Sequence, residues 1–416
     1  MKSWLEIACF AGFDWARDHH DVVIVDRDGK IVEQFRFDHS QEGWEQWHQK
    51  TKPFAPLAVA IETSFGAAVD QLLRGEATVY PVNPKSAQRY RDRKVPSGSK
   101  TDFLDAWSLA DALRIDGHGW KPLTATDPLT SQLRMLCRDE VQLIRQRTLL
   151  VNQLQQALVE YYPAALEAFD DWTMASTWDF IIEFPTPHTL VKAGKRRHEK
   201  FLHVHRLWRE QTAEKRMGIF ARADQFCGSA PMIAAKSTLA VSLAKILRTI
   251  QQQLDAYHKQ IEALFDQHPD HDLFGSLPGA GSFLAPRLLG EMGGGPARFE
   301  SPQHLQAIAG TAPVSYQSGQ IDKVRIRHHC DKFLRHAVHL WSDCSRKSCH
   351  WAQVYYQKKR EEGKSHACAL RCLGQRWLKI IWKMLQTHAP YDPELHAKNQ
   401  QLHGSWVLSL ITKTSK

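Results

Sequence analysis

The 416-residue sequence contains no run of about 18 consecutive apolar residues, the length that a helix needs to cross a bilayer. Its first residues lead directly into strand-like sequence, without a signal-peptide pattern. The eight cysteines are scattered along the chain rather than grouped as a disulfide framework. These absences predict a protein of a reducing cytosol with no membrane partner.

Two ligand-binding patterns are also missing. No glycine-rich phosphate loop is present, which argues against an ATP-dependent enzyme. The His and Cys residues of the last quarter follow no Cys-x₂-Cys spacing, so we expect no zinc site among His328, His329, Cys330, Cys344, Cys349 and His350.

Acidic residues are scarce in the last quarter of the chain. Residues 317–416 contain 18 Lys/Arg and 7 Asp/Glu, a net charge of +11, whereas the whole chain carries +9. The remaining 316 residues are therefore close to neutral. Positive charge confined to one region favours a nucleic-acid-binding surface over a merely solvated one.

The first 120 residues predict an α/β fold. Short apolar or alternating runs indicate strands at residues 7–13, 22–25, 31–37, 57–61 and 78–82. Asp28-Gly29 between the second and third runs is a hairpin signal. Helical patterns occupy residues 41–49 and 66–73, and another begins at Thr101. Three strands with a hairpin, followed by alternating helices and strands, predict an RNase H-like (RuvC-like) sheet.

Four carboxylates occupy special positions in this expected fold. Asp14 follows the first strand, Glu62 follows the fourth, and Asp102 and Asp105 lie three residues apart on one face of a helix. Each acid alone could cap a turn, lie on the surface or sit at a helix N-terminus, where the helix dipole favours negative charge. Their joint order favours a metal site. Oxygen-only ligands suit Mg²⁺ or Mn²⁺, and two such ions can assist phosphate chemistry.

Basic residues cluster between the last expected strand and these helical acids. We expect them to bind nucleic acid: Lys85, Arg89, Arg91, Arg93 and Lys100.

Residues 121–270 predict a helical coiled-coil spacer. Long helical patterns cover Leu133–Tyr161 and Ala234–Gln267, and apolar residues of the second alternate in steps of four and three. The two helices could pair within one chain or between chains. The sequence between them predicts a short helical insertion, whose basic cluster Lys195-Arg196-Arg197-His198 could contact nucleic acid.

Two segments of the last third carry further candidates. The turn around Gly279 and Gly281 resembles a helix-hairpin-helix that binds phosphate through backbone N–H groups, although a plain connection between helices is the alternative. Residues 310–319 predict a loop that contains the pair Ser318-Gly319. This serine is either part of a surface turn or a nucleophile beside phosphate-binding cations, namely Lys323, Arg325, Arg327 and Arg335.

Asp14, Glu62 and the segment Lys100-Thr101-Asp102-x-x-Asp105-Ala106 resemble the DEDD signature of one insertion-sequence transposase family. That family joins a RuvC-like N-terminal domain to a C-terminal serine transposase domain. It includes Piv-like invertases, and its transposases are implicated in bridge-RNA-guided recombination. Its Ala-Pro…Ser-Gly motif aligns with Ser318, with Ser315 as the second candidate. Residues 326–332 depart from the family pattern because they lack its glycine.

The resemblance implies four segments: a RuvC-like DEDD domain (1–120), the coiled-coil spacer with its insertion (121–270), a mainly α serine transposase domain (271–390) and a C-terminal tail (391–416). It implies a DNA transposase or site-specific recombinase, guided by a structured noncoding RNA, with a phosphoserine intermediate at a composite Mg²⁺-dependent site. A homodimer or homotetramer in the bacterial cytosol and nucleoid would follow. The alternatives are a RuvC-like nuclease or resolvase that uses water, and a non-catalytic nucleic-acid-binding scaffold.

Overall fold

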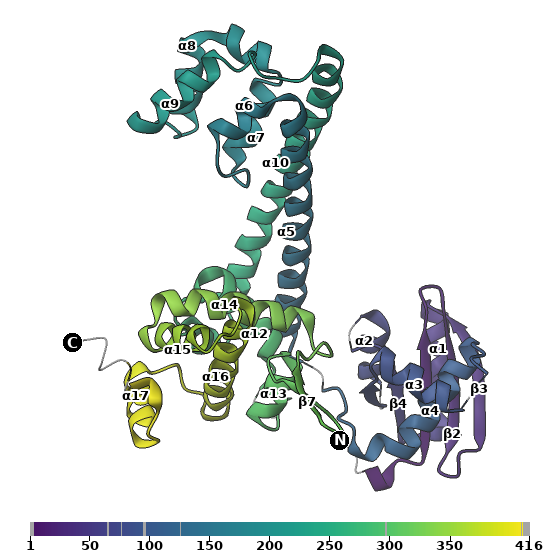
Figure 1. The fold of residues 1–416 in the computed structure, drawn as a ribbon. Helices are drawn as coiled ribbons and strands as arrows, with labels where there is room; N and C mark the ends of the chain where they lie inside the picture. Colours follow the sequence, from purple (N-terminus) through teal and green to yellow (C-terminus); the bar gives the residue numbers. More distant parts are fainter. Residues whose placement is uncertain are drawn as a thin grey trace. The chain divides into compact units, whose positions relative to one another are not determined.

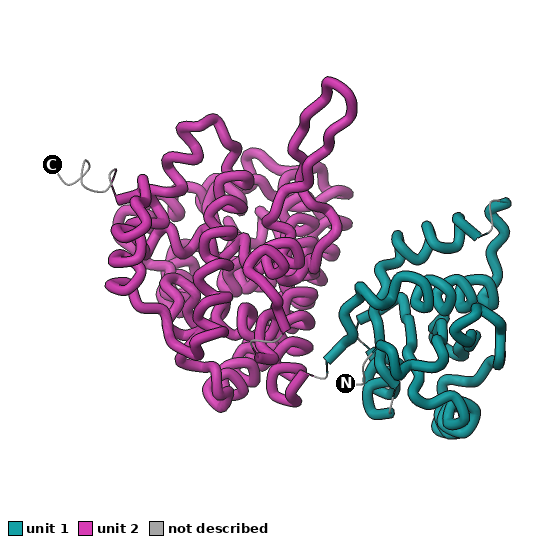
Figure 2. The backbone as a smooth tube through the Cα atoms, turned by 90° about the horizontal axis from the view of Figure 1, so that it is seen from below, with its two compact units in different colours: residues 1–125 teal, residues 126–416 magenta. Residues whose placement is uncertain are grey.

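The computed structural model describes residues 4–64, 66–75, 77–94, 97–124, 126–295, 298–408 and 410. The chain forms two compact units, Met1–Ala125 (unit 1) and Thr126–Lys416 (unit 2), coloured separately in Figure 2. The finer segment boundaries expected at residues 120, 270 and 390 stay predictions. Residues 411–416 of the expected tail lie outside the described residues.

Unit 1 is built on a mixed five-stranded sheet. Its strands are β1 (Cys9–Trp15), β2 (His19–Asp26), β3 (Ile31–Asp38), β4 (Leu57–Ile61) and β5 (Thr78–Pro81). Their order is β3-β2-β1-β4-β5. The first three strands pair antiparallel, and β1, β4 and β5 pair parallel. The predicted RNase H-like sheet is confirmed, and β1 runs on through Asp14 instead of ending before it.

Helices cover both faces of this sheet. Helices α1 (Gln41–Thr51) and α2 (Ala67–Arg74) bury side chains against one face, and α3 (Pro84–Lys94) and α4 (Asp102–Asp116) against the other. Single 3₁₀ turns lie at Trp4–Glu6, Lys52–Phe54 and Gly117–Gly119. The basic stretch that the sequence pattern left without a structure is helix α3.

Gly12 lets α4 lie directly on β1. A Cβ atom at this position would be 1.8 Å from the Ala106 carbonyl oxygen and 2.6 Å from the Ala110 backbone nitrogen. No side chain fits there without displacing the backbone of α4. The glycine therefore fixes the approach of the helix that carries Asp102 and Asp105.

Unit 2 is mostly helical and is organised along two long helices, α5 (Pro128–Tyr161) and α10 (Ala230–Asp266), which lie side by side (Figure 1). Both predicted long helices are confirmed, and in the structure they pair within one chain. Buried residues of α10 include the predicted positions Leu243, Leu247 and Leu254. One 18-residue window of α10, with mean hydropathy 1.3, is long and apolar enough to cross a membrane by length and composition alone. Packed core helices also pass that test, and α10 packs along α5.

A separate helical cap is inserted between α5 and α10. It consists of α6 (Pro163–Ala168), α7 (Ala175–Glu183), α8 (Pro187–Val204) and α9 (Glu210–Ala221). Its core is aromatic, with Trp178, Phe180 and Phe220 almost fully buried against the adjoining ends of α5 and α10. We call this segment the cap; it lies at one end of the long helical pair (Figure 1).

The other end of the pair joins a second helical cluster. It contains α11 (His271–Gly275), α12 (Gly281–Met292), α13 (Pro302–Ile308), α14 (Lys332–Ser348), α15 (His350–Glu361), α16 (His366–Thr387) and α17 (Pro393–Leu402). Trp341, Trp351 and Trp377 form the centre of its core. The expected loop at residues 310–319 is instead partly a strand. Strands β6 (Val314–Ser318) and β7 (Ile321–Arg325) form an exposed antiparallel hairpin.

Candidate active site

A cavity of about 250 Å³ opens on unit 1, and all four predicted acids line it. Its walls are Asp14, Glu62, Pro84, Gln88, Arg91, Lys100, Asp102 and Asp105. The structure thus brings together side chains from β1, α3 and α4, from the segment that follows β4 and from the segment between α3 and α4. Their convergence follows from the periodicity of the elements that carry them.

The strand acids face the cavity because of side-chain alternation. Phe10 of β1 and Ala58 and Ala60 of β4 are buried under α3 and α4, so Asp14 and Glu62, an even number of residues further on, point to the same face. Phe13 pairs with Ile61 in the parallel β1–β4 ladder, which places the two acids on neighbouring strands at the same level.

The helix acids are held by a capped helix start. The Thr101 hydroxyl accepts a hydrogen bond from the Leu104 backbone N–H at 3.1 Å, so α4 begins with Asp102 and Asp105 in its first turn. With the contact at Gly12, this cap fixes both the register and the distance of these two acids relative to β1.

Burial and repulsion from neighbouring acids raise the proton affinity of Asp14 and Glu62. Burial, followed by repulsion from Asp105, Glu62, Asp102 and Asp21, raises the pKa of Asp14 to about 7. Burial and the charge of Asp105 also raise the pKa of Glu62, although Arg91 and Lys100 oppose the shift. A partly buried group of carboxylates with this much mutual repulsion is suited to a bound cation.

Cations compensate the helix acids in the structure. Arg91 Nη1 lies 2.5 Å from Asp105 Oδ1, and Lys100 Nζ lies 3.9 Å from the other oxygen of that carboxylate. Arg36 of β3 bridges Asp21 Oδ2 at 2.9 Å and Asp102 Oδ2 at 2.8 Å. Of the predicted nucleic-acid-binding residues, Arg91 and Lys100 therefore face the cavity, whereas Lys85, Arg89 and Arg93 are exposed on α3.

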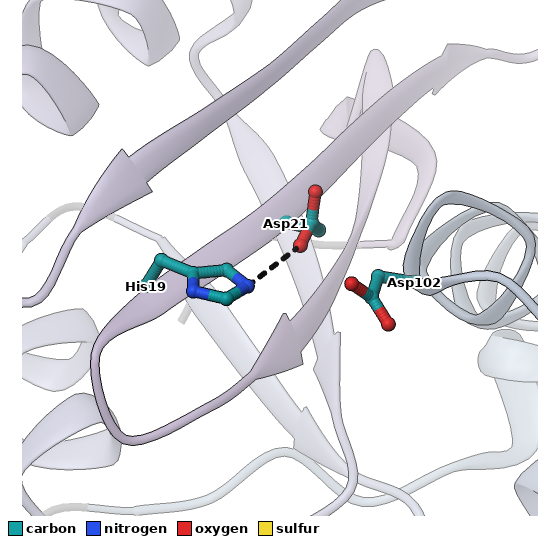
Figure 3. A group of neighbouring side chains, drawn as sticks. All are labelled: His19, Asp21 and Asp102. Carbon is teal, nitrogen blue, oxygen red and sulfur yellow. Dashed lines mark ion pairs between the residues drawn. The ribbon is translucent and has the colours of Figure 1, made fainter.

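A neighbouring group extends the acidic cluster. Ligand atoms of His19, Asp21 and Asp102 all lie within 4.8 Å of one another (Figure 3). Asp21 is directly opposite Asp14 in the β1–β2 ladder, and Arg36 is opposite Asp21 in the next. Sequence reasoning missed His19, Asp21 and Arg36. The predicted hairpin joins the second and third strands, so its register could have paired Asp21 with Arg36, whereas the pairing of Asp21 with Asp14 depends on β1 and β2.

The donor set fits a hard divalent cation. Asp14, Glu62, Asp102 and Asp105 offer carboxylate oxygens, which Mg²⁺ and Mn²⁺ prefer. Burial, together with repulsion from neighbouring acids, raises the pKa values of Asp14 and Glu62, and a bound cation would favour the charged form of both. His19 adds a nitrogen donor on one side, which Mn²⁺ accepts more readily than Mg²⁺.

The predicted nucleophile belongs to unit 2. Ser318 is the last residue of β6, and Gly319 follows with φ 55°, the conformation that glycine supplies at a two-residue hairpin turn. Strand alternation and the cross-strand pairs put Ser318 on one face with Tyr316, Lys323 and Arg325. The Arg325 guanidinium lies 4.3 Å from the Tyr316 ring centroid, which confirms that these side chains share a face.

Ser315 lies on the opposite face of the hairpin. Its neighbours there are Val324, which is its cross-strand partner, and the Gln317–Asp322 pair. That face carries an acid and no cation from either strand.

The remaining predicted positions are spread over unit 2. Gly279, with φ 72°, approaches α14 so closely that a Cβ atom would lie 2.9 Å from the Cys344 backbone. A Cβ atom at Gly281 would meet no atom within 4 Å. Arg327 lies just beyond β7 and donates to the Ala312 carbonyl oxygen at 3.3 Å. Arg335, in the first turn of α14, is half-buried. The structure does not gather these residues into one pocket among the described residues.

Two family matches account for the architecture. Residues 11–163 match the model of a DEDD transposase of IS110 type, and residues 271–357 match the transposase IS116/IS110/IS902 family. A DEDD transposase domain followed by the second transposase domain places the chain among the transposases, which are DNA-cutting enzymes that bind DNA. The first domain implies a divalent metal.

Relatives are similar over most of the chain. A mini-circle protein assigned as the transposase for IS117 of Streptomyces coelicolor is 32% identical over 407 residues, covering 93% of this chain and 96% of the relative. The 42 kDa protein of insertion element IS900 from Mycobacterium paratuberculosis is 30% identical, covering 71% and 73%. The 43.6 kDa protein of IS110 from Streptomyces coelicolor is 27% identical, covering 83% and 85%. The chain belongs to the IS110/IS116/IS902 family of transposases.

Proposed function

We propose that this transposase cuts and rejoins DNA through a covalent serine intermediate, with Ser318 as the nucleophile and Asp14, Glu62, Asp102 and Asp105 as ligands of Mg²⁺ or Mn²⁺. The choice of Ser318 over Ser315 rests on which side chains share a face of the β6–β7 hairpin with each serine. Ser318 shares its face with Lys323 and Arg325, whereas Ser315 shares the other face with Asp322. A phosphodiester that approaches Ser318 meets two cations, and one that approaches Ser315 meets a negative charge.

The chemistry exchanges one phosphoester bond for another. As the bond between Ser318 Oγ and phosphorus forms, a phosphorus–oxygen bond of the DNA backbone breaks, and the serine proton is balanced by protonation of the leaving DNA hydroxyl. Lys323 and Arg325 would hold the phosphate and offset the charge that grows on its oxygens. The bound divalent metal would supply Lewis acidity to the phosphate and help activate a hydroxyl that is otherwise a weak nucleophile.

The proposed site is composite, because Ser318 belongs to unit 2 and the acids belong to unit 1. We propose a homodimer or homotetramer, in which one subunit can supply the serine and another the acids. Met232, Leu239 and Ile246 support an oligomer. They are seven residues apart along α10 and 40 to 47% exposed, as expected of a coiled-coil seam.

The oligomer is tested by sedimentation of the full chain. Leu239→Glu with Ile246→Glu should lower the mass to that of a smaller assembly, because charge would replace apolar contact along the seam. Thr238→Glu with Gln252→Glu, on exposed positions of the same helix outside this heptad line, should leave the mass unchanged. An unchanged mass in the first variant would rule out this seam.

We further propose that a structured noncoding RNA guides target choice and that the protein acts in the bacterial cytosol and nucleoid. The family resemblance and the positive last quarter of the chain support the RNA, and eight free cysteines support a reducing compartment. Sequencing the RNA that copurifies with the protein tests the guide. Recovery of only bulk ribosomal and transfer RNA would contradict it.

The nucleophile is tested by trapping the covalent intermediate. A labelled DNA substrate incubated with the protein should give an adduct that survives denaturation, and Ser318→Ala should abolish it. Ser315→Ala serves as the matched control, because it removes a hydroxyl from the same strand, and it should retain the adduct. Full strand exchange by Ser318→Ala would refute the proposal.

One observation favours a second candidate, a RuvC-like nuclease that uses water. All four acids line a cavity within unit 1. In that case Ser318→Ala would still cut DNA, no adduct would form with either protein, and Asp14→Ala would stop cutting. Unchanged DNA processing by Asp14→Ala would instead indicate a scaffold without catalytic function.

A further inference from the structure

The cap lies between the two family matches and is covered by neither over most of its length. The first match ends at residue 163 and the second begins at residue 271. The part of the cap that faces solvent around the connection between α8 and α9 carries a combination of side chains that the transposase site does not use: unpaired cations beside an exposed aromatic pair.

The cations form a ridge on α8. Arg196, Lys200 and His203 are exposed and stand at i, i+4 and i+7, so they lie on one face of the helix after its kink at Gly194. Arg196 and Lys200 have no acidic partner among the described residues. The adjacent cations off this ridge are paired, Lys195 with Glu199 at 3.9 Å and Arg197 with Glu183 at 3.0 Å.

The ridge ends at an aromatic platform. The Trp208 indole stacks on the His203 imidazole, with ring centroids 4.5 Å apart and planes 16° apart, and Trp208 remains 36% exposed. Arg206 and Arg209 flank the indole in sequence, and both are exposed. Part of the indole thus stays open to solvent, and a partly exposed, stacked aromatic pair resembles a base-stacking platform.

The segment that carries the platform is held rigidly. Arg216 donates to the carbonyl oxygens of Leu207, at 2.8 Å, and Ala168, at 2.9 Å, and the Leu207 N–H donates to the Leu202 carbonyl oxygen at 2.8 Å. These bonds fix the residue between Arg206 and Trp208. Arg206 itself has φ 55°, a left-handed conformation that a non-glycine residue keeps only where its surroundings enforce it.

We propose that this surface binds an unpaired stretch of nucleic acid: a base stacks on Trp208, and Arg196, Lys200, Arg206 and Arg209 contact the flanking phosphates. Arg196 and Lys200 are about 6 Å apart along the helix axis, so they can follow successive phosphates of an extended strand. An indole face is accessible to a base only when that base is out of a duplex, which selects single strands, loops and bulges over paired helices.

A protein partner fits this surface less well. Exposed apolar side chains are few along the ridge, where Val204 is 67% exposed, and its two unpaired charges, Arg196 and Lys200, are both positive. Such a surface favours a polyanion with ring faces. The unpaired strand could come from an RNA loop or from melted DNA, and both offer the same phosphates and bases.

This proposal shares one assumption with the proposed function, namely that the protein binds nucleic acid. It is therefore tested by binding of the full chain in EDTA, where no metal-dependent cutting can occur. Labelled 20-nucleotide oligo(U), oligo(dT) and a 20-base-pair DNA duplex are titrated at several salt concentrations. Because EDTA removes the metal, this binding does not depend on metal-assisted cutting, so failure of the catalytic proposal would not affect the result.

Two variants separate stacking from charge. Trp208→Ala should weaken single-strand binding about 5- to 150-fold, as loss of one base–aromatic stack does, with duplex binding unchanged. Trp208→Phe should retain most of the affinity. Arg196→Gln with Lys200→Gln should reduce the salt slope for single strands by about 1.4, since each phosphate contact contributes about 0.7. A preference for oligo(U) would assign the site to RNA, and a preference for oligo(dT) to DNA.

The matched control is Lys195→Gln with Arg197→Gln, which removes the same charge from neighbouring but paired positions. It should change affinity less than twofold. Photocrosslinking with 4-thiouridine or 4-thiothymidine in the probes should label peptides within residues 196–209. Equal losses in the two double variants, no effect of Trp208→Ala, or crosslinks confined to other segments would each overturn the proposal.

Discussion

Moving the pH across neutrality should change the charge of the acidic cavity, because burial and three nearby cavity carboxylates raise the pKa of Asp14 to about 7. Its ordinary pKa is 3.8. Between these values the folded chain holds a proton that the unfolded chain has lost. By linkage, stability without metal falls as the pH rises through this window, and the loss is complete above about pH 7.

The size of this effect follows from the same shift. About 1.4 kcal/mol for each pH unit sets an upper limit near 4 kcal/mol, and solvent screening of this half-buried carboxylate reduces it to about 1 to 2 kcal/mol. Asp14→Asn removes the charge. At pH 8 and without metal, we therefore expect this variant to be more stable than the unaltered chain, by about 1 to 2 kcal/mol in urea unfolding.

Metal binding should show the opposite pH dependence. At pH 6 about nine in ten Asp14 side chains would carry a proton, which a bound cation must displace, so the apparent affinity should be about tenfold weaker than at pH 8. Titration calorimetry with Mn²⁺ in buffers of different ionisation enthalpy should detect release of about one proton per ion at pH 6.

The control is Asp14→Asn, in which proton release should disappear and the remaining affinity should vary little with pH. A Mn²⁺ affinity of the unaltered chain that is the same at pH 6 and pH 8 would refute the reasoning. So would metal-free stability that rises steadily from pH 5 to pH 8, because the cavity would then lack the repulsion inferred from its geometry.

Two further substitutions test packing. Gly12→Ala places a Cβ atom 1.8 Å from the Ala106 carbonyl oxygen, so it should lower unfolding free energy by about 1 to 3 kcal/mol and weaken Mn²⁺ binding, whereas Gly119→Ala, beside open space, should change stability by less than about 0.5 kcal/mol. Arg287→Met leaves the buried Glu140 carboxylate, which lies 2.8 Å from the Arg287 guanidinium, without its partner, and should lower the unfolding free energy by about 3 to 5 kcal/mol. Adding Glu140→Leu should restore much of that free energy. Urea unfolding measures both, and equal effects of the two glycine changes, or no rescue by the second core change, would contradict them.

The acids could be found from the sequence because each belongs to a strong local pattern. The apolar run Leu57–Ile61 predicts a buried strand, which places Glu62 at its end. Thr101 is a helix N-cap residue, so it predicts that a helix begins at Asp102. Their grouping then followed from the topology of the RNase H-like sheet. Local pattern and fold pointed to the same positions.

The partners of those acids were not visible, because they depend on pairing between distant segments. Arg36 precedes Asp102 by 66 residues, and only the strand register puts it beside Asp21. Helix α3 was missed because Ala87 is its one buried residue, which leaves no apolar period to detect. The serine hairpin was expected as a loop because both of its faces are exposed, so burial imposes no alternation on its sequence.

The cap begins and ends at one place. The Gly228 N–H donates to the Tyr161 carbonyl oxygen at 3.3 Å, so the chain returns to within a hydrogen bond of the point where it left the long helical pair. A segment closed in this way behaves as an exchangeable cassette. Its removal leaves two adjacent helix ends that a short turn can join, and its replacement alters no element at the other end of α5 and α10. The cap can therefore be exchanged without altering the sequence of the parts that carry the acids and the serine.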